Sequence, residues 1–109
     1  MVSKDAEKKI EQLQLYEQNL QNFLAQRQQF QIHLIEIESA LRELESTDKA
    51  YKLVGNIMVS SKKEDLKKEL SSRKETTELR IKTLEKQESQ IKEKASKLRT
   101  EVMELIKGK

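Results

Sequence analysis

The stretch of sequence that decides the fold is Asp-Lys-Ala-Tyr-Lys-Leu-Val-Gly-Asn-Ile-Met-Val-Ser-Ser, residues 48–61. Two short runs, 50–54 and 57–60, lie on either side of Gly55-Asn56 and carry the β-branched and aromatic side chains that suit strands. Glycine adopts a positive φ without a Cβ penalty, and asparagine tolerates the next position of a tight turn. The stretch therefore predicts a β-hairpin over about residues 49–61, in the middle of the chain.

The composition on both sides of this hairpin is typical of long helices. Charged residues make up 38% of the 109 residues, and the aromatic residues are two Tyr and two Phe, which is too little apolar bulk for a conventional globular core. Proline is absent, and the two glycines are Gly55 in the proposed turn and Gly108 near the C-terminus. Nothing interrupts the flanking segments, so residues 1–109 are predicted to form a single, mainly α domain.

The segment before the hairpin has a heptad repeat. Nine of its ten core positions between 13 and 44 are apolar or aromatic, which predicts a coiled-coil helix over about residues 4–46. Ser3 is a suitable N-cap, and Ser46-Thr47-Asp48 are residues that favour turns. The ten core positions are Leu13, Tyr16, Leu20, Phe23, Arg27, Phe30, Leu34, Ile37, Leu41 and Leu44.

The segment after the hairpin has a second, weaker heptad repeat and predicts a helix over about residues 62–107. Ser61 and Glu64 have the spacing of a capping box at its start, and Gly108 is a suitable stop. Three of its eleven core positions are polar or charged. These positions are Leu70, Lys74, Thr77, Ile81, Leu84, Glu88, Ile91, Ala95, Leu98, Val102 and Leu105.

Two such helices, each about 60 Å long at 1.5 Å per residue, can fold back on each other as an antiparallel coiled-coil pair. Aligning the two repeats from the hairpin outward places core positions opposite core positions. Two charged core residues, Arg27 and Glu88, then fall in adjacent layers, which predicts an ion pair that fixes the register.

The predicted hairpin is apolar on both faces, which indicates that it has partners. An isolated two-stranded hairpin is marginal in water, and one pair of helix ends cannot cover both faces and both edges. A sheet or closed barrel built from the hairpins of several subunits removes the edges. The residues expected to mediate this assembly are Tyr51, Leu53, Val54, Ile57, Met58 and Val59.

Two sequence blocks resemble the prefoldin beta subunits of archaeal type. One is the hairpin, residues 50–59, and the other is residues 73–88 of the second helix. The first helix is also similar in its glutamines at 26, 28, 29 and 31, so the resemblance covers nearly the whole chain. One departure is Thr77, where a larger apolar residue is expected.

The resemblance implies a subunit of a hexameric, ATP-independent co-chaperone. Two alpha-type and four beta-type subunits would join through their hairpins into a β-barrel platform. The free ends of the helical arms would hold unfolded or nascent proteins and pass them to a group II chaperonin in the cytoplasm. Without the resemblance, composition and spacing predict only a coiled-coil helical hairpin that assembles with other subunits through its strands.

The helix ends remote from the hairpin are the expected client-binding surface. Ile10, Leu15, Met103 and Ile106 are apolar residues outside the core positions there. The core residues Leu13, Val102 and Leu105 add to them, because their partners are poor; Val102 is expected to face Lys9. The same residues also fit the frayed ends of an ordinary coiled coil.

Catalysis, cofactor binding and metal binding are not predicted. Cysteine is absent, the one histidine, His33, lies beside the core, and no glycine-rich phosphate loop is present. The carboxylates alternate with lysines, as on solvated helix faces. No apolar run approaches the length needed to cross a membrane, and the N-terminus has no secretory signal.

Two other classes of function remain. One is a coiled-coil adaptor or tether without client-holding activity, for which a simple loop would serve in place of the hairpin. The other is a nucleic-acid-binding helical hairpin, which needs a one-signed basic face. The net charge of +3 and the acidic neighbours of each basic pair do not provide such a face.

Overall fold

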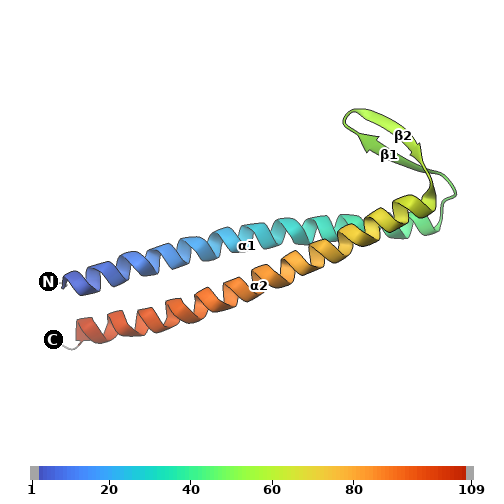
Figure 1. Ribbon diagram of the computed structural model, residues 1–109. Helices are drawn as coiled ribbons and strands as arrows, with labels where there is room; N and C mark the ends of the chain where they lie inside the picture. Colours follow the sequence, from blue (N-terminus) through green and yellow to red (C-terminus); the bar gives the residue numbers. More distant parts are fainter. Residues whose placement is uncertain (1–2, 108–109) are drawn as a thin grey trace. The chain divides into compact units, whose positions relative to one another are not determined.

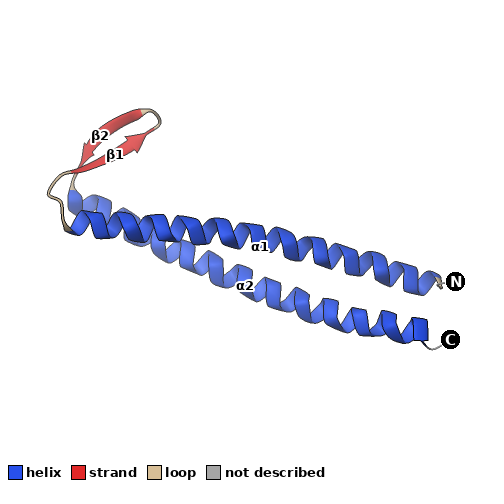
Figure 2. Cartoon of the chain, turned by 180° about the vertical axis from the view of Figure 1, so that it is seen from behind, coloured by secondary structure: helices blue, strands red, loops and turns tan. Residues whose placement is uncertain are grey.

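The computed structural model describes residues 3–107, so the expected helix stop at Gly108 lies outside the described residues. The elements follow the order α1 (Lys4–Glu45), β1 (Ala50–Val54), β2 (Ile57–Ser61) and α2 (Lys63–Lys107). The protein is mainly helical, with one antiparallel β-hairpin between two long helices (Figures 1 and 2). This confirms the predicted elements to within one residue at each boundary.

The chain divides into two compact units. The terminal unit contains residues 3–28 of the N-terminal part and 82–107 of the C-terminal part. The hairpin unit contains residues 29–81, and therefore the end of α1, both strands and the start of α2. Within each unit, α1 and α2 run in opposite directions (Figure 1).

In the terminal unit the two helices meet along a narrow seam formed by the predicted heptad positions. Every heptad core position there is buried or half-buried, whereas most residues between them are exposed. The best-covered side chains are all on this seam, and Ala6 and Ala95, at 1% and 2% exposure, are the most buried. Small side chains at these layers let the two backbones approach. The buried residues of this unit are Ala6, Leu84, Glu88, Ala95 and Val102.

An ion pair crosses the seam of the terminal unit, as the sequence predicted. Arg27 Nε donates to both carboxylate oxygens of Glu88, at 3.0 and 3.1 Å. The Glu88 side chain is only 9% exposed and that of Arg27 is 23% exposed. A partly desolvated, two-oxygen contact of this kind has a definite geometry, so it specifies one register of α1 against α2.

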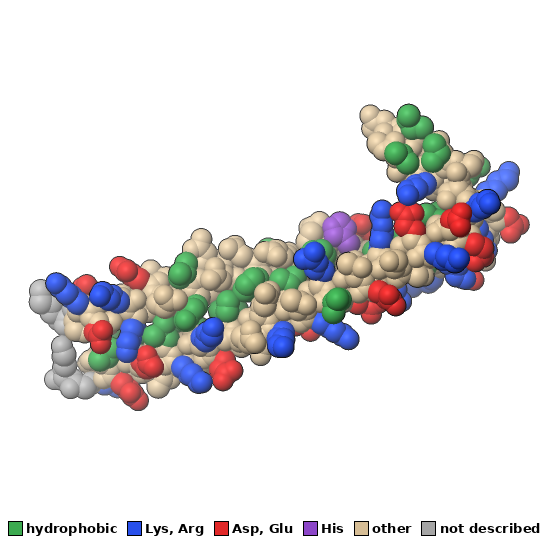
Figure 3. Space-filling model, in the orientation of Figure 1, with side chains coloured by type: hydrophobic (Ala, Val, Ile, Leu, Met, Phe, Trp, Pro, Cys, Tyr) green, Lys and Arg blue, Asp and Glu red, His purple; other side chains and the backbone are tan. Residues whose placement is uncertain are grey.

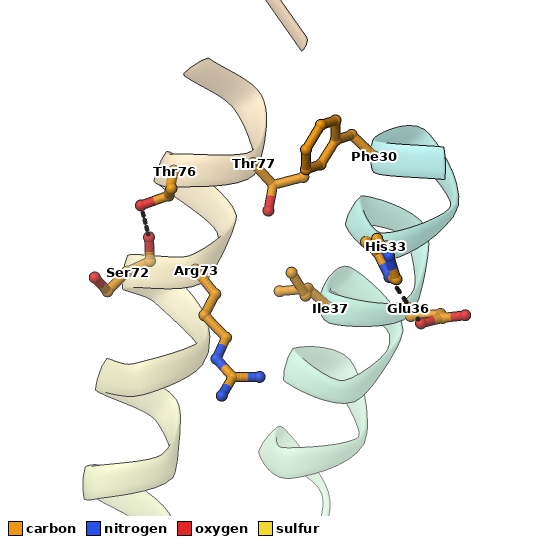
Figure 4. Close-up of a pocket in the computed structure, with 8 residues that line it drawn as sticks. All are labelled: Phe30, His33, Glu36, Ile37, Ser72, Arg73, Thr76 and Thr77. Atoms are coloured by element: carbon orange, nitrogen blue, oxygen red, sulfur yellow. Dashed lines mark hydrogen bonds and ion pairs between the residues drawn. The ribbon is translucent and has the colours of Figure 1, made fainter. Parts of the chain in front are cut away.

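In the hairpin unit the seam has a weaker layer around Thr77. Its side chain is buried, and those of Phe30 and Ile37 point toward it from α1 (Figure 4). A cavity of about 370 Å³ opens here, lined also by Ser72 and Arg73. The threonine is smaller and more polar than the residue expected at this position, and the layer is not filled. The other buried residues of the unit are Leu44, Ala50 and Ile81.

The hairpin has the predicted two-residue connection. The strands pair in antiparallel register, with Leu53 opposite Met58 and Val54 opposite Ile57. Gly55 has φ +62°, and Asn56 does not share the positive φ. A positive φ at the first central position alone is the pattern of a type II′ turn, which matches the right-handed twist of paired strands.

The helix ends confirm one predicted cap and correct another. Ser3 Oγ accepts a hydrogen bond from the Ala6 backbone N–H at 3.2 Å, so Ser3 is the N-cap of α1 as predicted. Ser61 does not cap α2, because it is the last residue of β2 and its hydroxyl donates to the Lys62 carbonyl at 3.5 Å. Pairing of Ser61 with Ala50 extends the hairpin by one residue, and α2 begins at Lys63.

Replacing Glu88 by Ala is expected to destabilise the chain by about 2 kcal/mol, because Arg27 keeps its charge in the seam without a partner. Urea unfolding followed by circular dichroism at fixed protein concentration measures the change. The control is Glu93→Ala, which removes an exposed pair with Lys97 on the same helix and is expected to cost less than about 0.5 kcal/mol. Equal effects of the two substitutions would show that the seam pair contributes no more than a surface contact.

Candidate functional site

The largest group of exposed apolar side chains is on the hairpin. Lys52 lies opposite Val59, on the face that also carries Val54 and Ile57. The opposite face carries the other three apolar residues. Six apolar side chains are exposed on two strands of five residues each, which leaves an apolar surface open on both faces. Their exposed fractions are Tyr51 54%, Leu53 67%, Val54 57%, Ile57 67%, Met58 64% and Val59 40%.

One charged contact attaches the hairpin to α2. Lys52 Nζ donates to both carboxylate oxygens of Glu69 at 3.0 Å. Arg73, one turn along α2, adds a contact of 3.1 Å to the same carboxylate. The hydrogen bond from Lys52 holds the pKa of Glu69 below its ordinary value, and the Arg73 charge acts in the same direction. The only lysine within the strands is therefore bound to the chain's own helix.

A second ion pair joins the two helices next to the hairpin. Lys67 Nζ lies 2.9 Å from a carboxylate oxygen of Glu45, the last residue of α1. The hydrogen bond between them lowers the pKa of Glu45 and raises the pKa of Lys67. Both side chains are largely exposed, so this contact orients the helix ends more than it stabilises them.

The apolar residues expected at the helix ends are only partly exposed. Leu15, Met103 and Ile106 are 49%, 49% and 53% exposed. These three residues are named the terminal apolar cluster. Ile10, Leu13 and Leu105 are half-buried along the seam.

The expectation that the Val102 side chain is poorly covered is wrong. It is only 7% exposed. The Lys9 ammonium, which was expected to face it, pairs instead with Glu101 Oε2 at 3.2 Å. Val102 is therefore part of the seam and does not add to the exposed apolar surface.

The side chains with acid–base chemistry form no centre among residues 3–107. His33 is half-exposed, with Nδ1 3.7 Å from Glu36 and Nε2 3.4 Å from the Gln29 amide. It lines the cavity beside Thr77 (Figure 4). Within the described range, no group of three His, Cys, Asp or Glu residues is placed to hold a metal ion. None of the described helices is both long and apolar enough to cross a membrane.

Comparison with known proteins agrees with this architecture. Residues 7–109 match the protein family described as Prefoldin subunit. The chain belongs to the prefoldin subunit family. It is 43% identical to the prefoldin subunit beta of Archaeoglobus fulgidus over 100 residues, which cover 89% of this chain and 86% of that protein. It is 32% identical to the prefoldin subunit beta of Methanospirillum hungatei over 111 residues, covering 99% and 92%.

The fold is also that of a solved prefoldin subunit. The crystal structure of the prefoldin beta subunit from Thermococcus strain KS-1 matches with a TM-score of 0.85 and 34% identity, over 94% of this chain and 92% of that one. Prefoldin is a co-chaperone, and membership of its family implies assembly with other prefoldin subunits. The exposed hairpin of this prefoldin subunit is a surface suited to such assembly.

The sequence did not identify the contact between Lys52 and Glu69. A lysine in an otherwise uncharged hairpin was a visible signal, since a charge on an apolar strand calls for a partner. Several acidic residues at the start of α2 could have supplied it. Which of them pairs with Lys52 depends on the orientation of the hairpin relative to α2, and the sequence pattern does not specify this orientation.

Acidification is expected to release the hairpin contact. Because the folded pKa of Glu69 is lowered, the contact stabilises the fold above the ordinary pKa of 4.5 and is lost as the pH falls through the folded value. Carboxyl-carbon NMR of the folded chain measures this pKa directly. In Lys52→Met the pKa of Glu69 should rise toward the ordinary value, whereas Lys67→Met should leave it in place. An unchanged value in Lys52→Met would show that the contact does not form in solution.

Proposed function

We propose that this prefoldin subunit is a beta-type subunit of a hexamer that holds non-native proteins without ATP. Two alpha-type and four beta-type subunits form the particle, which acts in the cytoplasm and delivers its clients to a group II chaperonin. The subunit takes part as a binding protein and not as an enzyme, and it needs no cofactor. The observation that carries the proposal is the apolar hairpin, exposed on both faces, in a chain that belongs to the prefoldin family.

The hairpin supports assembly for a physical reason. Two strands alone leave unpaired backbone groups on both edges and apolar side chains on both faces. Strands from neighbouring subunits satisfy the edges, and closure into a barrel leaves none exposed. The bound Lys52 keeps its charge attached to α2, so the apolar side chains can be covered without burying an unpaired ammonium.

The terminal apolar cluster supports client binding. Its three residues are about half-exposed, and methionine adapts to irregular apolar partners because its side chain is flexible. Each cluster is small, so a single arm binds weakly. Several arms of one particle that contact the same client gain avidity, which suits the capture and release of unrelated sequences.

Leu53→Asp or Ile57→Asp is expected to abolish the hexamer formed with an alpha-type partner. Each change buries a carboxylate at the subunit contact and should weaken association by about fiftyfold or more. Size-exclusion chromatography with light scattering measures the particle, and circular dichroism checks that the arms stay helical. The control is Leu24→Asp, which adds the same charge on α1 in the terminal unit and should leave the hexamer intact. A hexamer formed normally by both hairpin variants would refute the assignment of the hairpin.

Met103→Ser combined with Ile106→Ser is expected to leave the hexamer intact and to weaken client protection. Suppression of light scattering by a chemically denatured client, without ATP, should require roughly fivefold more chaperone, because two apolar contacts per arm are lost. The control is Leu79→Ser, which changes an exposed leucine of α2 in the hairpin unit. If the double variant protects as well as the control, the client-binding role of the cluster is wrong. A wild-type hexamer without protective activity would favour an adaptor or tether.

A further inference from the structure

The middle of α1 carries far less charge than the start of the same helix or the end of α2. Residues 18–28 contain one charged side chain, Arg27, whereas residues 4–17 of the same helix contain seven. Residues 82–107 of α2, in the same unit, contain twelve. On the face shown in Figure 3, charged side chains gather over α2 and the start of α1, and the middle of α1 is largely uncharged. In a chain with 38% charged residues, this segment needs an explanation.

The uncharged surface is an exposed stripe of side-chain amides. Its residues lie at the heptad positions that face away from the seam, and all are exposed. Leu15, from the terminal apolar cluster, is exposed on the same outward side of α1. The amide stripe consists of Gln14, Gln18, Gln21, Asn22 and Gln28.

Both charged side chains within residues 17–28 are directed to α2. Arg27 is bound to Glu88 in the seam, and the Glu17 carboxylate lies 3.4 Å from Arg99 Nη2. Among residues 3–107, the amides of the stripe make no hydrogen bond to another side chain or to the backbone. Their donors and acceptors therefore face solvent.

Depletion of charge on an exposed surface is typical of a surface that binds protein. Each side-chain amide offers two N–H donors and a carbonyl acceptor, the same groups that a polypeptide backbone presents. Such a stripe can bind an unfolded chain through its backbone, whatever its side chains are. The absence of charge also avoids rejecting client segments of either sign.

We infer that the amide stripe is a second client-binding surface, which binds the extended backbone of a non-native polypeptide that the terminal apolar cluster has captured. This inference rests on the proposed holding function and extends it from side-chain contacts to backbone contacts. Leu15, which lies between Gln14 and Gln18 in the sequence, brings exposed apolar surface next to the amide stripe on α1. A second copy of the chain is a less suitable occupant, because a stable helix contact needs a continuous row of large apolar anchors, and only Leu15 and Leu24 are exposed beside the stripe.

The test uses Gln18→Ala with Gln28→Ala, which removes two amides from the stripe without changing charge and keeps a good helix former. The matched control is Gln87→Ala with Gln90→Ala, two exposed amides of α2 in the same unit. Each variant is assembled into the hexamer with the alpha-type partner. The probes are two reduced, alkylated and fluorescently labelled unfolded proteins of opposite net charge, and fluorescence anisotropy gives Kd.

The α1 variant should bind both probes about tenfold more weakly than wild type, and the loss should persist at 0.5 M NaCl because no charge is involved. The α2 control should stay within twofold of wild type. Equal affinities of the two variants would overturn the inference while leaving the proposed function in place. Dissociation of the hexamer in the α1 variant alone would also overturn it, because the stripe would then be a subunit contact. A wild-type hexamer that binds neither probe would instead contradict the holding function itself.

Discussion

The structure depends on one constraint, which is that two helices can bury only a narrow stripe of each other. The seam contains every well-covered side chain of the terminal unit, and even there most leucines remain half-exposed. Long helices of this kind gain most of their stability from the side chains buried in the seam, and residues outside the seam add little. Apolar residues outside the seam therefore stay open to solvent unless another chain covers them. The exposed hairpin and the terminal apolar cluster are two consequences of this single limit.

Much of the fold could be predicted from the sequence because its signals are local and repeated. The heptad positions from Leu13 to Leu44 predicted which face of α1 is buried, and Gly55-Asn56 predicted the position and length of the turn. The pair of Arg27 and Glu88 followed from aligning the two repeats. The heptad spacing, the turn residues and the charge pairing all indicate the same arrangement of helices and strands, and for this reason the elements were predicted correctly.

The failures were at places where two elements meet and the outcome depends on geometry. Ser61 had the spacing of a capping residue, but pairing with Ala50 placed it in β2. Val102 was expected to have a poor partner in Lys9, but Val102 is buried and the Lys9 ammonium pairs with Glu101. The partner of Lys52 could not be chosen among several acids. A long charged side chain can reach several partners, and several residues near a helix end can cap it. The sequence allows all of these alternatives, and the packed structure selects one.

The bidentate contact between Lys52 and Glu69 also affects how temperature acts on the protein. Because the only charge within the strands is bound internally, the surface left for partners is almost purely apolar. Burial of such a surface is driven by water entropy near room temperature and carries a large negative heat-capacity change. Association through it therefore strengthens on moderate warming and loosens in the cold. A hexamer held together by these hairpins would withstand moderate warming better than cold.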